Sequence, residues 1–585
     1  MTINNFPIAL IYLAGAIILM LVPRRVRSAA YLVFPVIAFI ILLQLEVGAS
    51  YSISFLNYEL VLCQVDKLSL AFGYVFVIMS FLGGIYAFHV KDSLQQVAAL
   101  LYVGSSLGVV FTGDLLTLLI CWEIMAITSL GLIWARRTPD SRKAGFRYLV
   151  VHLFGGSVLM AGILMYYNET GSMLFTHFGG TVASYLILIG FALNAAIPPL
   201  NGWLPDAYPE GTVTGSVFLS AFTTKVAVYV LARGFAGMEA LMWAGAAMAV
   251  YGVIFAFLAN DSRRLLSYHI ISQVGYMVCA VGIGSQMAIN GATAHAFAHI
   301  LYKGLLFMGM GTLLYATGKS KLSELGGLSR SMKLALVLFM VGAFSISGVP
   351  LFSGFVSKSL VIHAAGEEHL ALIVLLLNLA SVGTFLSIAL KLPYFAWFGP
   401  DRGIKPKPVP RGMYIAMALT GLLCFVIGVY PDLLYNLLPY DIHYQPYTAS
   451  HLMETFQLII FTGLAFWLVK SKLHAESNIT LDFDWFYRRP AGLAYTVFST
   501  GICELFGWVE RQTLRLVYSI MRFGTNPPGY LATAVNRSKR VFAPGAQSSG
   551  DTPAYSPDRY RITLGFMVLV VVICLVVIMF WNAFR

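Results

Sequence analysis

The chain has 585 residues, of which 58% are hydrophobic and only 11% are charged, a balance that excludes a soluble globular domain. Its formal net charge of +12 does not indicate nucleic-acid binding, because the basic residues are distributed in groups between apolar runs. Apolar windows of about 20 residues, the length that crosses a bilayer, recur from Phe6 to Phe584. The sequence therefore predicts an all-α polytopic membrane protein.

We predict about sixteen transmembrane helices. In chain order they lie near residues 6–23, 29–46, 68–89, 95–112, 114–135, 145–166, 181–204, 211–233, 240–259, 264–285, 288–315, 333–364, 369–397, 411–430, 450–469 and 562–583. Between the second and third, the segment YSISFLNYELVLCQV is rich in β-branched and aromatic residues with partial alternation. That pattern predicts a short external hairpin.

Charge predicts the orientation of the chain in the membrane. Basic residues gather in loops that follow odd-numbered spans: Arg24, Arg25, Arg27, Arg136 to Lys143, Arg263, Arg264, Lys319, Lys321, Arg402 to Lys407, Lys470 and Lys472. Loops after even-numbered spans instead carry acidic residues: Glu46, Glu59, Asp66, Glu169, Glu367, Glu368 and Asp441. By the positive-inside rule we expect a multi-pass protein of the cell inner (plasma) membrane with its N-terminus outside, and we interpret Arg263 and Arg264 as cytoplasmic anchors.

Two predicted spans contain residues that break a helix. The segment AAIPPLNGWLPDAYPEG has Pro198, Pro199 and Pro205, which remove backbone donors. The segment MKLALVLFMVGAFSISGVPLFSGFVSKSLVIHAA is too long for one straight crossing at about 1.5 Å per residue. It carries Gly348, Pro350 and Gly354 near its middle. Broken helices are tolerated at membrane depth where they line protein or a wet cavity, and in transporters they mark the ion site.

The surroundings of the two breaks predict an internal repeat. Each break is followed by a span with one buried lysine, Lys225 after the first and Lys391 after the second. The copies are five spans apart, an odd number, so they would cross the membrane in opposite senses. The predicted parts are N-terminal spans with the hairpin, a first inverted repeat, a second inverted repeat, C-terminal core spans, a cytoplasmic amphipathic segment with linker, and a terminal transmembrane helix, at 1–94, 95–235, 240–400, 405–472, 473–560 and 561–585.

Beyond Lys472 the pattern changes. The segment LDFDWFYRRPAGLAYTVFSTGICELFGWVERQTLRLVYSIMRFG mixes apolar positions with recurring arginines. It predicts an amphipathic helix that lies along the cytoplasmic interface or against neighbouring subunits. The next stretch, residues 526–561, is rich in Pro, Gly and Ser and predicts a loose tether before the terminal span.

A few charged residues lie well inside apolar runs: Glu123, Lys225, Lys303 and Lys391. A lysine or aspartate at a helix centre costs roughly 2.5 to 3.5 kcal/mol, so such residues normally face a bundle interior or a wet cavity. The row therefore predicts an ion path. The six cysteines form no C-x-x-C pair and have no partnered histidine, so we expect neither a metal nor a redox cofactor.

Several motifs together resemble one family. CWEIMAITS, PPLNGWLPDAYPEGTVTGSVFLSAFTTKVAVY, DSRRLLSYHIISQVGYM, AHAFAHILYKGLLFMGMG and SGVPLFSGFVSKSLV, in order over roughly residues 60–400, resemble the antiporter-like subunits of respiratory complex I and the Mrp multisubunit cation/proton antiporters. WLPDAYPE followed by TTKVAVY is more similar to the D-type member of the Mrp group. The resemblance implies fourteen core helices in two inverted five-helix repeats, each with a discontinuous helix, plus a lateral helix and a terminal span. It also implies proton translocation along a central hydrophilic axis.

The resemblance carries over to particular residues. The positions that match the family's proton relay are Glu123, Lys225, His295, His299, Lys303, Lys358 and Lys391. One position departs, because Asn194 stands where the family usually has a lysine that partners the glutamate. We expect Glu123 to take Lys225 as its cation instead, and Asn194→Lys to perturb coupling by competing with Lys225. A static structural ion pair is the alternative, although a permanent buried pair gains little over an apolar one.

The other relay positions also have alternatives. His295, His299 and Lys303 lie at i, i+4 and i+8 on one helix face, a spacing that suits zinc but lacks a nearby carboxylate or thiolate, so we favour a relay. His152 is either a hydrogen-bonded core histidine or a relay member. Lys358 and Lys391 are either relay members or lysines whose amines reach toward an interface.

The sequence thus predicts a proton-translocating membrane subunit of a multisubunit complex, with the D-type subunit of a Na⁺/H⁺ antiporter as the leading assignment. The alternative is a proton-pumping arm subunit of a redox-driven complex, such as a complex I-like, membrane-bound hydrogenase or formate-oxidising relative. A passive scaffold is opposed by the number of buried charges. We expect no catalysis by this chain alone and no cofactor. The expected partners are other membrane subunits, protons, the lipid bilayer and, for an antiporter, Na⁺.

Overall fold

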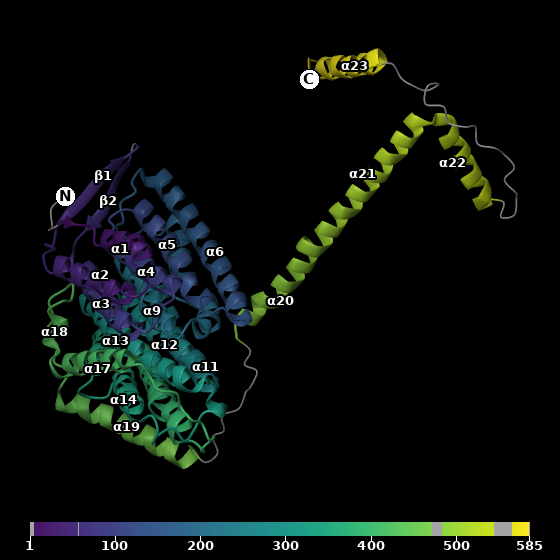
Figure 1. Ribbon diagram of the computed structural model, residues 1–585. Coiled ribbons are helices and arrows are strands. Elements are labelled where there is room, and N and C mark those ends of the chain that lie inside the picture. Colours follow the sequence, from purple (N-terminus) through teal and green to yellow (C-terminus); the bar gives the residue numbers. More distant parts are fainter. Residues whose placement is uncertain (1–4, 57, 471–481, 543–563, 584–585) are drawn as a thin grey trace. The chain divides into compact units, whose positions relative to one another are not determined.

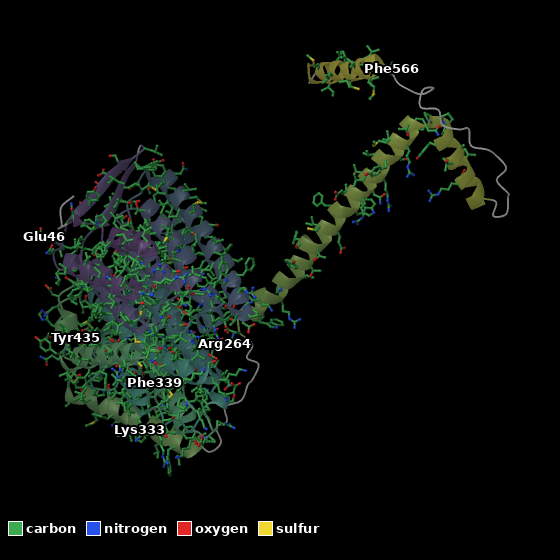
Figure 2. All side chains as sticks on the ribbon, in the orientation of Figure 1. Glu46, Arg264, Lys333, Phe339, Tyr435 and Phe566 are labelled. Atoms are coloured by element: carbon green, nitrogen blue, oxygen red, sulfur yellow. The ribbon has the colours of Figure 1, made fainter. Side chains whose placement is uncertain are left out.

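The computed structural model describes residues 5–56, 58–470, 482–542 and 564–583. The chain divides into two compact units, Met1–Asp484 and Trp485–Arg585. The first unit holds a bundle of helices with one small hairpin, which lies at the edge away from α19 (Figure 1). Side chains fill the space between these helices, among them the fully buried Phe339 (Figure 2).

The first half of this bundle leads from the N-terminus to the first helix break. Its elements are α1 (Ala9–Leu21), α2 (Arg27–Leu42), β1 (Ser50–Phe55), β2 (Tyr58–Gln64), α3 (Lys67–Tyr86), α4 (Ser93–Phe111), α5 (Leu115–Trp134), α6 (Pro139–Thr170), α7 (Val182–Asn194), α8 (Trp203–Ala207), η2 (Tyr208–Glu210), α9 (Gly215–Ala221) and α10 (Thr223–Gly234). The strands β1 and β2 pair antiparallel, at the segment where alternation predicts strands.

The second half contains two deeply buried helices, α12 and α13. Its elements are α11 (Glu239–Leu258), α12 (Ser262–Ile283), α13 (Gln286–Thr317), η3 (Leu322–Glu324), α14 (Lys333–Ser347), α15 (Ser353–Glu367), α16 (Ala371–Thr384), the π-helices η4 (Phe385–Lys391) and η5 (Tyr394–Phe398), α17 (Arg411–Val429), α18 (Asp432–Tyr435) and α19 (Ala449–Val469). The apolar windows of α12 and α13 are each 94% buried, whereas that of α19 is 11% buried. In the first half, the window of residues 215–234 is 100% buried, so the bundle centre lies at α9, α10, α12 and α13.

Helix ends follow the capping residues in the sequence. Asp66 and Thr138 form capping boxes with Ser69 and Ser141 at the starts of α3 and α6. Gly171, Gly284 and Gly318 adopt positive φ just after α6, α12 and α13. Glycine takes this left-handed conformation without the steric cost that a Cβ brings, so it ends the helix cleanly.

The predicted membrane fold is confirmed as mostly helical and polytopic. Within the described residues, eleven helices are long and apolar enough to cross a membrane. Five further apolar helices are shorter: Ala9–Leu21, Arg27–Leu42, Val182–Asn194, Lys333–Ser347 and Gly565–Met579. Short apolar helices such as α7 and α14 are what a broken span leaves on one side of its break.

Both predicted breaks are present, but two of the six predicted break residues lie inside helices. The first break separates α7 from α8 and contains Pro198 and Pro199, while Pro205 lies within α8. The second separates α14 from α15 and contains Gly348 and Pro350. Gly354 lies in α15, where a Cβ would overlap the backbone oxygen of Ser345. It allows the two halves to pack closely and does not end a helix.

Two matching bridges support the proposal of an internal repeat. Asp114 caps α5 and forms an isolated antiparallel bridge with Leu174, after α6. Asp261 caps α12 and forms the same kind of bridge with Lys321, after α13. In each predicted repeat, the bridge joins the start of the second helix to the chain that follows the third helix. The fourth span of each repeat is the broken one. Sequence comparison alone shows little of this correspondence, because backbone atoms make the bridges.

The second unit contains α20 (Asp484–Ala494), η7 (Tyr495–Gly501), α21 (Ile502–Thr525), α22 (Pro527–Phe542) and α23 (Leu564–Ala583). The predicted tether is wrong over Pro527–Phe542, which is helical. Asn526 caps this helix through the backbone N–H of Gly529, at 3.1 Å, and proline is well tolerated in a first helical turn. The rest of the predicted tether lies outside the described residues.

Candidate ion path

The centre of the bundle carries three titratable side chains on one face of α13. His295, His299 and Lys303 are all fully buried, as the spacing predicts. The ring centroids of His295 and His299 are 6.4 Å apart. His299 has Lys225 and Lys303 among its charged neighbours, so α10 and α13 bring their basic groups together.

Several buried polar atoms of this face have no hydrogen-bond partner among the described residues. They are both ring nitrogens of His299 and the amine of Lys303, which lies 6.0 Å from the centroid of the Phe307 ring. An unsatisfied buried polar group costs about 1 to 3 kcal/mol. Buried water is the usual partner of such groups. The face therefore has the chemistry of a hydrated proton relay.

A hydrogen-bonded link joins the central face to the second break. His295 contacts the Ser357 hydroxyl at 3.1 Å through Nδ1, and the amide oxygen of Gln273 at 3.2 Å through Nε2. Because an amide oxygen can only accept, Nε2 carries the hydrogen in the neutral ring and Nδ1 accepts from Ser357. Ser357 directly precedes Lys358 in α15. Lys358 is itself among the charged neighbours of His295, so the histidine and the next basic residue lie near each other.

Lys358 connects this link to a polar cavity. Its amine donates to the Ile346 backbone oxygen at 2.8 Å, next to the break. It also lines a cavity of about 1210 Å³. Further titratable residues line the same cavity: His363, Asp432, His443, His451 and Glu454. Lys358 is the one lysine or arginine among the described residues of that lining, so a proton on its amine can be exchanged with a space large enough for many waters.

Lys225 lies at the start of α10, directly after a second kink in the first half. It is fully buried, and its amine donates to the Ser220 backbone oxygen at 2.6 Å and to the Thr224 hydroxyl at 3.0 Å. The break between α9 and α10 at Phe222 exposes the carbonyl that it contacts. This second discontinuity has no proline or glycine to predict it.

The expected pair of Glu123 and Lys225 is not formed. The described residues contain no ion pair of Glu123 within 4.0 Å. Instead Glu123 lies on α5 against α6, where a Cβ on Gly156 would overlap its Oε1. The prediction was wrong because the sequence does not show which helix packs beside Glu123. In the structure that helix is α6, which does not carry Lys225. Asn194 is buried at the end of α7, and its amide nitrogen has no partner in the described chain.

Lys391 lies away from the cavity at Lys358. It belongs to η4, and its amine donates to the backbone oxygens of Phe257 and Ala259, the latter at 3.2 Å. These carbonyls belong to the end of α11, where helices leave acceptors unpaired. Lys391 therefore caps α11, a use that neither of its two predicted roles included.

Several polar residues of the path were missed from sequence. His269 on α12 is fully buried, contacts Ser387 at 2.7 Å and has Lys303 and Lys358 among its charged neighbours. Gln273, one turn later, holds His295. Both lie in SYHIISQ, so polar residues within a predicted span were a usable signal.

Arg263 is not the interfacial anchor that the loop charges predict. It is 2% exposed, and one of its terminal nitrogens donates to the backbone oxygens of Gly211 and Thr212 at 2.9 and 3.1 Å. Arg264, by contrast, is exposed. Arg263 thus satisfies carbonyls in the irregular chain between η2 and α9.

We expect Arg263→Met to lower the free energy of unfolding by about 2 kcal/mol, because charge-assisted bonds to buried carbonyls are lost. Arg264→Met is the matched control and should cost less than about 1 kcal/mol. Thermal unfolding of the purified complex in detergent measures both. Equal losses in the two variants would contradict the difference in role.

The described residues contain no group of three histidine, cysteine, aspartate or glutamate side chains placed to hold a metal ion.

Comparison with known proteins gives one family. The family model described as NADH:quinone oxidoreductase/Mrp antiporter, TM, matches residues 112–387. An uncharacterized protein of Methanocaldococcus jannaschii is 28% identical over 375 residues, covering 60% of this chain and 77% of that protein. The D-type subunit of the Na⁺/H⁺ antiporter of Alkalihalophilus pseudofirmus is 31% identical over 316 residues, covering 50% and 64%. The N-type subunit of the NADH-quinone oxidoreductase of Desulforudis audaxviator is 28% identical over 361 residues, covering 56% and 72%.

Two solved structures share the fold. A chain of the Mrp complex from a Dietzia species superposes with a TM-score of 0.65 at 20% identity, covering 77% of this chain and 98% of that one. A chain of the membrane-bound sulfane sulfur reductase, an archaeal respiratory membrane complex, gives 0.66 at 24% identity, with coverage of 77% and 98%. The match at residues 112–387 includes all but one of the predicted relay residues, so this part of the chain is similar to the NADH:quinone oxidoreductase/Mrp antiporter transmembrane family.

Proposed function

We propose that this chain is the proton-translocating subunit of a multisubunit membrane complex. The observation that carries the proposal is the buried row from Lys225 through the His295, His299 and Lys303 face to Lys358, which ends in the polar cavity. A row of titratable groups at this depth is too costly to keep without a use. Its members are separated by hydroxyls and unpaired polar atoms, the arrangement that proton transfer through water needs.

The cavity gives the path one end. His363, which lines it, has its Nε2 3.2 Å from Oε1 of Glu367, and Glu367 ends α15 on the side that the charge pattern places outside. The proposed outlet of Lys358 is thus on the outer side of the plasma membrane. Two broken helices, one near each half of the row, allow the path to open to one side at a time.

Sodium/proton antiport by a D-type subunit is the leading form of the proposal. Its support is the match to a D-type antiporter chain, together with the WLPDAYPE and TTKVAVY motifs. The alternative is a redox-driven complex in which peripheral subunits hold the redox centres, supported by the match to an N-type chain of a quinone oxidoreductase. In both forms the partners are other membrane subunits.

The experiment that tests the path uses the whole complex, purified through a tag on this chain and reconstituted into liposomes. Proton movement is followed with an internal pH dye after a sodium gradient or a redox substrate is applied. We expect Lys225→Ala and Glu123→Gln to reduce proton movement strongly in complexes that still assemble. Unchanged movement in both variants would overturn the proposal.

The same preparation separates the two forms of the proposal. An antiporter is expected to move protons in response to sodium alone and to copurify with small membrane subunits. A redox-driven complex is expected to copurify with dehydrogenase or hydrogenase subunits and to be silent until its electron donor is added.

A further inference from the structure

We infer that His152, with a row of hydroxyl groups beside it, carries the proton between Glu123 and Lys225, which do not contact each other. The inference rests on the proposed function, since it names a further group of the same path. His152 lies on α6 and is 2% exposed. It precedes Gly156 by one helical turn, and Gly156 is the residue against which the Glu123 carboxylate lies.

The bonds of the imidazole leave one nitrogen ready to accept a proton. Nδ1 lies 2.9 Å from the backbone oxygen of Tyr148, one turn earlier. Because a carbonyl oxygen only accepts, Nδ1 must carry the hydrogen of the neutral ring, and Nε2 holds a free lone pair. Nε2 is buried and has no hydrogen-bond partner among the described residues. A core histidine kept for stability alone would be expected to use both nitrogens.

The ring is held in place by aromatic contacts. It stacks on Tyr148 at a centroid distance of 3.9 Å and meets the edge of Trp203 at 4.6 Å. Trp203 in turn donates to the Leu193 backbone oxygen at 3.0 Å, so α8 joins α7 at this point. The next residue is Asn194, whose amide nitrogen is also buried without a described partner. Two unsatisfied polar atoms thus lie around one packed site next to the first break.

Hydroxyl groups lead from this site to Lys225. The Tyr148 hydroxyl bonds Ser129 at 2.8 Å, and Thr223 on α10 is a polar neighbour of the same hydroxyl. The Thr223 hydroxyl bonds Tyr102 at 2.6 Å. The hydroxyl of the residue after Thr223 accepts from the Lys225 amine at 3.0 Å. All these side chains except Ser129 and Tyr102 belong to α6, which carries His152, and to α10, which carries Lys225.

The proton transfers balance without any co-reactant. The Glu123 carboxyl gives one proton to Nε2 of His152, which leaves a carboxylate and an imidazolium. Nε2 releases that proton to the hydroxyl row, in which each group accepts one hydrogen and passes on another, and the neutral amine of Lys225 takes up the last. The Nδ1 bond to Tyr148 is unchanged throughout, so the ring returns to the same tautomer.

The test measures proton movement in the reconstituted complex. His152→Gln removes the titratable nitrogen and is expected to slow proton movement by about a hundredfold, the lower end of the effect of a lost proton-transfer group. Tyr148→Phe keeps the ring stack and removes one hydroxyl, so we expect a smaller but clear loss. The matched control is His89→Gln: His89 also has an unpartnered buried Nδ1 among the described residues and an aromatic neighbour, Tyr315 at 5.4 Å, but lies after α3, and its variant should be fully active.

A second-site change separates proton transfer from packing. Asn194→Lys places a new amine beside the site, and in the His152→Gln background it should restore much of the rate. In the wild-type background the same change adds a competing cation and should lower coupling. A packing defect at position 152 would not be repaired by an amine on another helix.

The outcomes decide the inference. A fully active His152→Gln complex overturns it, as does a loss that Asn194→Lys does not restore while Tyr148→Phe is fully active. If His152→Gln does not assemble, Tyr148→Phe decides alone, and full activity overturns the inference. Failure of the proposed function looks different, because Lys358→Ala would then move protons normally. An inactive Lys358→Ala with an active His152→Gln rejects the role of His152 only.

Discussion

Replacing Lys358 with alanine is expected to abolish proton translocation in an assembled complex. Lys358 is the one lysine or arginine among the described residues that line the polar cavity, and it follows directly after the Ser357 hydroxyl that bonds His295. Without its amine, the described cavity lining loses its lysine next to Ser357, the residue that bonds His295. Proton uptake by liposomes that contain the variant should equal that of liposomes without protein.

Lys358→Arg distinguishes a relay from a fixed charge. Arginine keeps the positive charge, but it does not release its proton at physiological pH. A relay therefore fails with arginine, whereas a lysine that only anchors the helix would be replaced without loss. Lys333→Ala, at the exposed start of α14 in the same broken span, is the control and should be fully active. Normal transport by Lys358→Arg would contradict the relay role.

Replacing Lys303 with methionine is expected to abolish transport and to raise thermal stability. The Lys303 amine is fully buried and has no hydrogen-bond partner among the described residues, so its charge is expensive to keep in the folded state. Methionine has a similar shape and no charge, and it fills such a site well. The unfolding temperature of the purified complex should therefore rise while proton uptake is lost, the exchange of stability for activity that functional sites show.

Lys225→Met is the comparison for the stability measurement. The Lys225 amine already makes two hydrogen bonds, to Ser220 and Thr224, so its removal leaves a carbonyl and a hydroxyl without a partner. We expect transport to be lost but no gain in stability. A Lys303→Met variant that is less stable than the wild type and still transports protons would show that Lys303 has a structural role.

Most of the membrane fold follows from local sequence features. Apolar runs predict the helices because a span must satisfy its own backbone in lipid. Pro198, Pro199, Gly348 and Pro350 predict the two breaks because each removes a donor or permits a turn. Pro205 and Gly354 were misassigned for a common reason, since short helices restart directly after a break. The helix of residues 527–542 was missed because its composition, rich in proline, predicts a loop. The capping residue Asn526 before the prolines was not recognised as the start of a helix.

The partners of the buried groups do not follow from the sequence. Glu123 lies against Gly156 and not beside Lys225, Arg263 satisfies carbonyls about 50 residues earlier in the chain, and Lys391 caps α11. Each of these contacts joins helices or loops separated in sequence. Which groups meet depends on the side of each helix that faces its neighbour. Each step of one residue along a helix turns the side-chain direction by about 100° around the helix axis.

The sequence by itself therefore determined that this protein is a polytopic membrane protein, which titratable groups lie within its apolar segments, and where its two broken spans are, because these depend on local hydrophobicity, charge and backbone chemistry. Only the tertiary structure decided the order of those groups. It joined His295 to Ser357, placed Glu123 against Gly156 and not in an ion pair with Lys225, and held His152 against the Tyr148 backbone oxygen. Proton transfer acts over a few ångströms, and packing between helices sets distances on that scale.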